Sequence, residues 1–266
     1  MTSQSGINLF TEIGRLYFDF DFVSNSVFFY VNLFFRFFDL RIAFETSARD
    51  DRDKIWIVHG PLRTPVKLVD VLEQILAFML STRHEIVVID FHNFENGFGS
   101  YVSNLNERHQ LVEQLVIDYL GAFLVPAELG YGKPIRDLAA LNKRVFVGYK
   151  RDQRNARFFH VHAYHVWANT DEKSTLFRYL NERACRSQSA NYLVSLMTEL
   201  TPGLFKMFRD KYQGLRNLAQ QVNYDVSVHL FEEWWQCANV VATDFFLGNN
   251  VIEFAIEANL KRESKR

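Results

Sequence analysis

The sequence predicts an α/β fold, arranged as one closed or nearly closed barrel of alternating strands and helices. From Arg36 onward, short β-type runs alternate with stretches in which apolar residues recur every three or four positions. No linker rich in Gly, Ser or Pro interrupts this alternation, and 266 residues are enough for one large domain. An unbroken repeat of strand, loop and helix is typical of (β/α) barrels.

Most of the predicted strands are apolar on both faces, as buried parallel strands are. They are Phe37–Ala43, Lys54–Val58, Ile86–Phe91, Arg144–Tyr149, His162–Trp167, Tyr192–Leu196 and Val240–Phe245. Between them, the apolar spacing predicts helices over Val66–Leu80, Glu107–Leu120 and Leu204–Val222. Pro65 and Pro202 stand just before two of these helices, where a helix start tolerates proline.

The beginning of the chain departs from this pattern. Several of the 26 Phe residues crowd into the first few dozen positions. We expect an atypical Phe-rich segment over 1–33, the barrel over 34–260 and a charged, solvated tail over 261–266. The apolar run Val27–Phe38 contains Asn32 and Arg36 and is shorter than the about 20 apolar residues that a bilayer span needs. Neither a transmembrane helix nor a secretory signal is therefore expected.

The composition indicates a folded protein of nearly neutral charge. Hydrophobic residues make up 48% of the chain, and only 12 Gly and 5 Pro are present, which excludes disordered and collagen-like proteins. The formal net charge of -1 argues against a nucleic-acid partner. Cys185 and Cys237 are too few for a metal cluster or a disulfide framework. They predict buried thiols and a reducing, cytoplasmic location.

Polar side chains stand at the ends of predicted strands, where a barrel collects its active-site residues. They are Asp39, Arg41, His59, Asp90, His92, Lys150 and Asp244. Alternation along a strand directs Asp39 and Arg41 to one side, and Asp90 and His92 likewise. Cations that hold an anion, with a histidine that moves protons near neutral pH, suit phosphate ester chemistry. Taken singly, these residues also have structural explanations. Asp39 and Arg41 would form a buried ion pair, and His59 would be a hydrogen-bonded histidine of a loop.

A second group of histidines alternates along a later segment. His160, His162 and His165 have the spacing of a strand, and no fourth ligand with suitable spacing accompanies them. The pattern indicates a partly exposed strand rather than a metal site.

Seven segments, in this order, resemble the phosphatidylinositol-specific phospholipase C (PI-PLC) X-domain-containing family. They are Arg-Phe-Phe-Asp-Leu-Arg-Ile-Ala (36–43), Ile-Val-His-Gly (57–60), Val-Leu-Glu-Gln-Ile-Leu-Ala-Phe (71–78), His-Glu-Ile-Val-Val-Ile-Asp-Phe-His-Asn-Phe (84–94), Leu-Asn-Lys-Arg-Val-Phe-Val-Gly-Tyr (141–149), Val-Trp-Ala-Asn-Thr (166–170) and Ala-Asn-Val-Val-Ala-Thr-Asp-Phe-Phe (238–246). The resemblance covers roughly residues 34 to 260. It implies a distorted TIM-type barrel of the PLC-like phosphodiesterase kind, with an atypical or missing first strand here.

The resemblance also implies a phosphoric diester hydrolase that cleaves a phosphatidylinositol-type lipid through a cyclic inositol phosphate. One histidine takes the proton of the inositol 2-hydroxyl, and another protonates the departing diacylglycerol oxygen. His59 matches the acid histidine, Arg41 the phosphate-binding arginine of the metal-independent branch, and Asp39 would orient its neighbours. Calcium-dependent relatives have carboxylates where this chain has Arg41, so no metal or other cofactor is expected. The predicted substrate-binding residues are Asp90, His92, Lys150 and Asp244.

One part of the family pattern has no match. The family's first catalytic histidine lies in a His-Asp-Ser segment before the strand of Asp39, but no histidine precedes His59 in this chain. Loss of one acid/base group typically lowers a rate by about 10²–10⁴-fold. The chain is then either an enzyme or an inactive barrel that retains an anion pocket of Arg41, Lys150 and His59. His92 is a conceivable substitute, although a hydrogen bond to a neighbouring loop is the simpler explanation.

A lipid substrate implies peripheral contact with a membrane surface. Phe94 and Phe98 are the aromatic side chains expected at the barrel rim, whereas the tandem Trp234 and Trp235 are expected to be half in the core. A further interpretation is that the atypical first strand leaves an unpaired sheet edge and an aggregation-prone chain.

Overall fold

The structure, a computed structural model, describes residues 12–14, 36–60, 62–186, 189, 191–203, 212, 214–246 and 249–264. The chain divides into two compact units: residues 18–162 with 1–6, and residues 163–266 with 7–17. Each unit has its own sheet and its own hydrophobic core. Apart from 12–14, the predicted Phe-rich segment and the run Val27–Phe35 lie outside the described residues. The predicted boundaries at 33 and 260 remain predictions.

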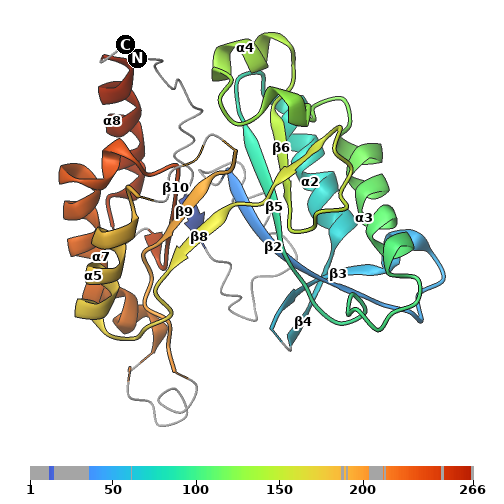
Figure 1. Cartoon of the computed structure of the whole chain (residues 1–266), viewed down its shortest axis with the longest axis horizontal. Helices are drawn as coiled ribbons and strands as arrows, with labels where there is room; N and C mark the ends of the chain where they lie inside the picture. Colours follow the sequence, from blue (N-terminus) through green and yellow to red (C-terminus); the bar gives the residue numbers. More distant parts are fainter. Residues whose placement is uncertain are drawn as a thin grey trace. The chain divides into compact units, whose positions relative to one another are not determined.

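The first unit contains a six-stranded sheet with the order β4-β3-β2-β5-β6-β7 (Figure 1). Its strands are β2 (Phe37–Phe44), β3 (Ile55–His59), β4 (Leu62–Lys67), β5 (Val87–Phe94), β6 (Val145–Tyr149) and β7 (Phe159–Val161). Strands β2, β5, β6 and β7 are parallel neighbours, as their apolar character predicts. Strand β3 instead runs antiparallel to β2, because the connection 45–54 is too short for the dozen or more residues of a parallel crossover.

Helices α2 (Leu68–Ser81) and α3 (Leu105–Leu120) cover one face of this sheet (Figure 1), and a short helix α4 (Ile135–Ala140) precedes β6. Alternate residues of β5, namely Val87, Ile89 and Phe91, join the core that the two helices close. Both helices were predicted. Helix α2 begins later than expected, because Pro65 lies in β4 and the Lys67 backbone N–H is capped by Asp70 Oδ2 at 2.8 Å. The residues of β5 between them face the opposite side of the sheet.

The second unit contains a four-stranded parallel sheet with the order β1-β10-β9-β8. Its strands are β1 (Glu12–Gly14), β8 (Tyr164–Trp167), β9 (Val194–Met197) and β10 (Val240–Thr243). Helices α5 (Lys173–Arg183), α7 (Leu215–Glu232) and α8 (Val251–Glu263) pack on its apolar face. Among the helices described in either unit, none is long and apolar enough to cross a bilayer.

Three predictions in and near the second unit need correction. Helix α7 begins at Leu215, after Gly214 with a φ of 91°; residues 204–211 lie outside the described residues. The expected strand His162–Trp167 is shorter at its start, because β8 begins at Tyr164. Part of the expected solvated tail continues α8. Within it, the Arg262 guanidinium donates to the carbonyl of Ala238 at 3.1 Å and to that of Trp235, and burial lowers its pKa to about 10.

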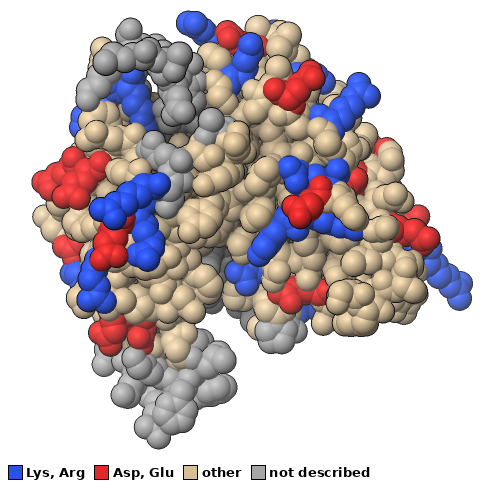
Figure 2. Space-filling model, in the orientation of Figure 1, with Lys and Arg blue, Asp and Glu red and all other residues tan. Residues whose placement is uncertain are grey.

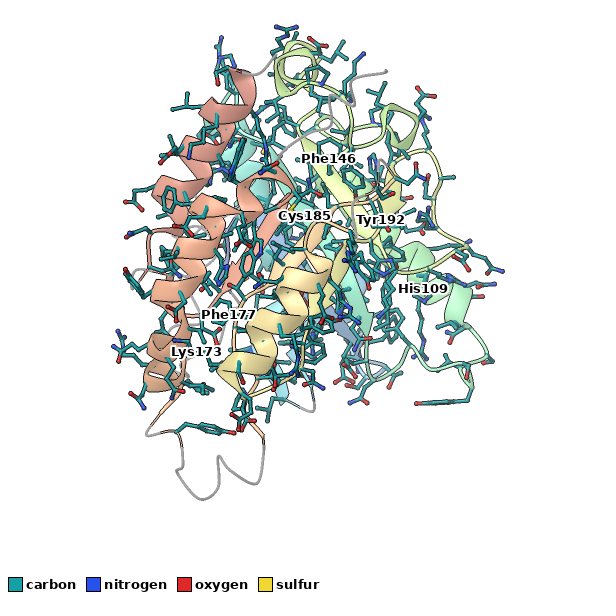
Figure 3. All side chains as sticks on the ribbon, turned by 60° about the vertical axis from the view of Figure 1, so that its left-hand side comes forward. His109, Phe146, Lys173, Phe177, Cys185 and Tyr192 are labelled. Carbon is teal, nitrogen blue, oxygen red and sulfur yellow. A yellow bond between two sulfur atoms is a disulfide. The ribbon has the colours of Figure 1, made fainter. Side chains whose placement is uncertain are left out.

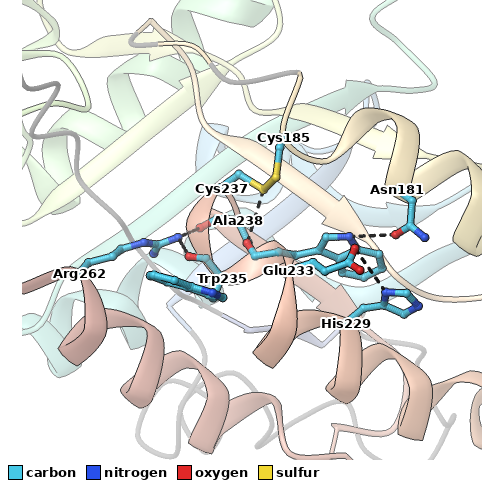
Figure 4. The surroundings of a disulfide bond; sticks show 9 residues. Asn181, Cys185, His229, Glu233, Trp235, Cys237, Ala238 and Arg262 are labelled. Carbon is cyan, nitrogen blue, oxygen red and sulfur yellow. Dashed lines mark hydrogen bonds and ion pairs between the residues drawn. A yellow bond between two sulfur atoms is a disulfide. The ribbon is translucent and has the colours of Figure 1, made fainter. Parts of the chain in front are cut away.

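Cys185 and Cys237 form a disulfide, which contradicts the prediction of two free thiols (Figure 4). Cys185 follows α5, and Cys237 follows a 3-10 turn, η3 (Trp234–Gln236). The sequence separates the cysteines by 52 residues, but packing of both segments on one core brings their Cα atoms to 5.1 Å. The cysteines therefore no longer support a reducing compartment.

Candidate active site

Polar residues line up on the face of the six-stranded sheet that α2 and α3 leave uncovered. Four residues are in register across the parallel strands β2, β5, β6 and β7. They are Asp39, Asp90, Gly148 and His160. Side chains in register on neighbouring strands share a face of the sheet. The structure therefore brings together Asp39 and Asp90, which the sequence had assigned to separate pairs.

A β-bulge shapes this row where β2 and β5 end. Leu40 pairs with Phe91 but Arg41 pairs with Asn93, so His92 is the extra residue of β5. Bulges re-aim side chains next to many active sites. A ring nitrogen of His92 lies within 4.8 Å of a carboxylate oxygen of Asp39. The acid and the imidazole thus come from different strands, a pairing that sequence spacing does not reveal.

Asp90 lies deep in the sheet, with only 1% of its surface exposed. Its carboxylate extends over the neighbouring strand at Gly148, where an added Cβ would stand 2.1 Å from Asp90 Oδ1. The glycine therefore leaves room for the carboxylate. Burial, together with the charge of Asp90, raises the pKa of Tyr131, whose hydroxyl donates to the Val161 carbonyl at 3.0 Å. Tyr131 borders the polar row, and no pattern in the sequence marks this residue.

We expect Gly148→Ala to lower the free energy of unfolding by about 1–3 kcal/mol, because the new methyl group displaces the Asp90 carboxylate from a packed site. Urea denaturation of both proteins measures the change. Gly132→Ala is the matched control, since a Cβ there meets no atom within 4 Å. Equal stability of Gly148→Ala and the unaltered protein would contradict the described position of Asp90.

His160 has a structural role in this row. It is buried, its Nε2 lies 3.1 Å from the Val125 carbonyl oxygen, and burial lowers its pKa to about 4. A ring of low pKa that is buried against a backbone carbonyl is neutral at neutral pH and is packed as part of the fold. The expectation of a partly exposed strand is therefore wrong for His160.

Cationic residues lie at the same end of the sheet. Lys150 is exposed directly after β6, and its backbone N–H donates to the Phe91 carbonyl at 3.1 Å, beside His92. Arg41 is half-buried and lies two positions after Asp39, on the same face by strand alternation. Arg154, in the loop after β6, donates to the carbonyls of Arg151 at 3.0 Å and Phe159 at 3.1 Å. No strand-end pattern marks Arg154 in the sequence.

His59 ends β3 and is exposed, opposite Leu62 in the hairpin with β4. Gly60, with a φ of 56°, makes the turn that follows. Since Ile57 pairs with Ile42, the chain reaches His59 alongside the middle of β2, the part that carries Arg41. The roles of His59, Arg41 and Asp39 in catalysis remain predictions.

Asp244 lies in the second unit, just after β10, and is buried. Asn223 of α7 donates through Nδ2 to its carbonyl oxygen at 3.1 Å and so fixes the end of the strand. Glu199, also buried, follows the adjacent strand β9. The strand-end rule that selected Asp244 could also have selected Glu199, had β9 been extended to Met197.

The expected exposure of rim aromatic residues is wrong for Phe98, which is buried, whereas Phe94 is half-buried and its proposed membrane contact stays a prediction. The rings of Phe94 and Phe98 pack on the His109 ring at centroid distances of 4.7 and 5.0 Å. His109 lies on α3 (Figure 3). His109 Nδ1 lies 2.8 Å from the Tyr149 hydroxyl, and burial lowers the pKa of His109 to about 4. Trp234 is buried, consistent with its assignment to the core.

Comparison with known proteins gives relatives by sequence and by structure. No family model matches the chain. "PI-PLC X domain-containing protein 3" of Danio rerio is 29% identical over 185 residues, 68% of this chain and 54% of the relative, and the Homo sapiens protein of that name is 26% identical over the same shares. "PI-PLC X domain-containing protein 1" of Mus musculus is 23% identical over 85% of this chain. The chain thus spans about half the length of the first two relatives.

Solved structures show the fold. Phosphatidylinositol-specific phospholipase C from Listeria monocytogenes superposes with a TM-score of 0.66 over 97% of this chain and 96% of its own, at 15% identity. A Staphylococcus aureus phosphatidylinositol-specific phospholipase C gives 0.66 over 97% of this chain, at 9% identity. The predicted α/β class and distorted PLC-like barrel are confirmed, although the described strands form two sheets rather than a closed ring.

Proposed function

Because this chain is a relative of the PI-PLC X domain-containing proteins and has the PI-PLC fold, we propose that it is a phosphoric diester hydrolase of the phosphatidylinositol-specific phospholipase C type. The observation that carries the proposal is the polar row of the first unit, where Asp39, Asp90 and His92 meet on one face of the sheet. Arg41 and Lys150 supply positive charge at the same end. Such a combination suits a phosphodiester anion whose cleavage needs proton transfer.

In the proposed reaction, Arg41 holds the phosphate oxygens through charge-assisted hydrogen bonds. The inositol 2-hydroxyl gives its proton to a base and attacks phosphorus, and the bond from phosphorus to the diacylglycerol oxygen breaks. His59 gives its proton to that leaving oxygen, and the product is a cyclic inositol phosphate. Asp90, His92 and Lys150 of the first unit are proposed contacts to the head group, and the substrate-binding role of Asp244 stays a prediction. Because Arg41 supplies the positive charge at the phosphate, the reaction is proposed to proceed without a metal ion.

The proposed partner is a phospholipid in a membrane surface, reached by peripheral contact. The Staphylococcus aureus enzyme binds membranes. On the face of the molecule drawn in Figure 2, the described Lys and Arg side chains are interspersed with Asp and Glu. A mixed surface of this kind gives little general attraction to polyanions, so recognition is proposed to depend on the site itself.

Purified protein is expected to release cyclic inositol phosphate from phosphatidylinositol vesicles, at a rate that excess chelator leaves unchanged. Arg41→Ala should lower the rate about 100-fold or more, since it removes a charged contact to the phosphate. Arg83→Ala, an exposed arginine in the loop 82–86 before β5, is the matched control. Phosphorus NMR of the water-soluble product identifies it. No phosphate ester release by the unaltered protein would refute the proposal.

A second candidate is a binding module without turnover. It is favoured by one observation, that no histidine precedes His59 in the sequence. Saturable binding to phosphatidylinositol vesicles, weakened by Arg41→Ala and unaccompanied by product, would support the module over the enzyme.

A further inference from the structure

His92 and Asp39 form the arrangement that a general base requires. We propose that His92 is a catalytic residue which accepts the proton of the attacking hydroxyl, and that Asp39 is its positioning residue. This inference rests on the proposed function. It supplies the proton acceptor for which the sequence offers no match before His59.

The first ground is the position of the ring. His92 is the extra residue of the bulge between β2 and β5, at the carboxyl end of a parallel strand. Active sites of barrel enzymes collect at these ends, and bulges commonly re-aim side chains there. The ring is half-buried with its Nδ1 atom buried, so one side of the imidazole is held by the protein while the residue keeps access to solvent.

The second ground is the acidic partner. The Asp39 carboxylate lies within 4.8 Å of a ring nitrogen of His92, and Asp39 Oδ1 is itself buried. A carboxylate beside an imidazole fixes its orientation and stabilises the imidazolium that forms when the ring accepts a proton. Asp39 pairs in register with the buried Asp90, so a second carboxylate supports the same face.

The third ground is the relation to His59. Strands β3 and β5 are the two neighbours of β2, so the strands that carry His59 and His92 flank the strand that carries Arg41. Adjacent strands are about 4.8 Å apart, which separates β3 from β5 by about 10 Å. A phosphate group held at Arg41 would then have the attacking oxygen toward one histidine and the leaving oxygen toward the other.

The O–H bond of the inositol 2-hydroxyl breaks and its proton goes to His92. The oxygen forms a new bond to phosphorus as the bond from phosphorus to the diacylglycerol oxygen breaks. That oxygen takes the proton of the His59 imidazolium. The products are diacylglycerol, cyclic inositol phosphate, a protonated His92 and a neutral His59.

Two substrates distinguish the role of a general base from that of a general acid. Phosphatidylinositol needs both, whereas an inositol phosphodiester of nitrophenol needs only the base, because nitrophenolate leaves without a proton. We expect His92→Gln to lower kcat about 100-fold or more on both substrates. His59→Ala should do so on the lipid and lose less than about tenfold on the nitrophenyl ester. Asp39→Asn should also lower kcat on both substrates, by a smaller factor than His92→Gln.

The controls keep the test decisive. His84→Gln, in an exposed histidine of the loop before β5, should behave as the unaltered protein on both substrates. His92→Asn provides a second variant, and thermal melts report whether each variant is folded. Folded His92 variants that keep full turnover would overturn the inference while leaving the proposed function intact. A loss confined to the lipid substrate would also overturn it, by making His92 an acid.

If chelator abolishes the activity of the unaltered protein, the pair of Asp39 and His92 is a metal-ligand pair and the inference fails. If the unaltered protein cleaves neither substrate, the proposed function fails first, and the inference with it.

Discussion

His59→Ala is expected to lower kcat for phosphatidylinositol hydrolysis by about 10²–10⁴-fold, with a much smaller change in KM. The proposed role of His59 is to protonate the diacylglycerol oxygen as it leaves, a contribution made in the transition state rather than in substrate binding. The residue is exposed at the end of β3, so its removal should leave the core of the first unit unaffected. Initial rates over a range of vesicle concentrations separate the two constants.

The control for His59→Ala is His84→Ala, another exposed histidine of the same unit. Its rate and melting temperature should match those of the unaltered protein. A raised KM at unchanged kcat for His59→Ala would mean that His59 binds the head group without transferring a proton. That result would remove it from the catalytic residues.

Cys185→Ala is expected to lower the free energy of unfolding by up to about 4 kcal/mol, the loop-closure value for 52 residues. The disulfide joins Cys185, after α5, to the buried Cys237, after η3 (Figure 4). The buried Trp234 of η3 also donates through Nε1 to Asn181 Oδ1 at 3.1 Å. Removal of the cross-link increases the conformational entropy of the unfolded chain. The substitution itself leaves only a small cavity, because Cys185 is exposed. Urea unfolding in oxidising buffer measures the difference.

Reductant supplies the matched control for the disulfide. It should destabilise the unaltered protein by a similar amount and leave Cys185→Ala unchanged. Equal midpoints for the oxidised and reduced unaltered protein would show that the cross-link contributes nothing. Because stable disulfides persist in oxidising compartments, a large effect would also weigh against the predicted cytoplasmic location.

The local pattern of the sequence was informative about elements and less so about their partners. Lys54–Val58 was identified as a strand, but its antiparallel pairing followed from the short connection to β2. Phe94 and Phe98 were expected at a rim because they flank a polar loop, yet α3 covers them with His109. The direction of β3 thus depended on the length of a connection, and the burial of Phe98 depended on packing by a later helix.

The sequence by itself determined the α/β class, most strands and helices, and the polar residues at strand ends. These follow from the periodicity of apolar residues, which depends on local backbone geometry. The tertiary structure decided that His92 is a bulge residue beside Asp39, that Asp90 extends over Gly148, and that Cys185 meets Cys237. Those contacts depend on strand register and on packing between distant segments, and a one-residue change of register alters which side chains meet.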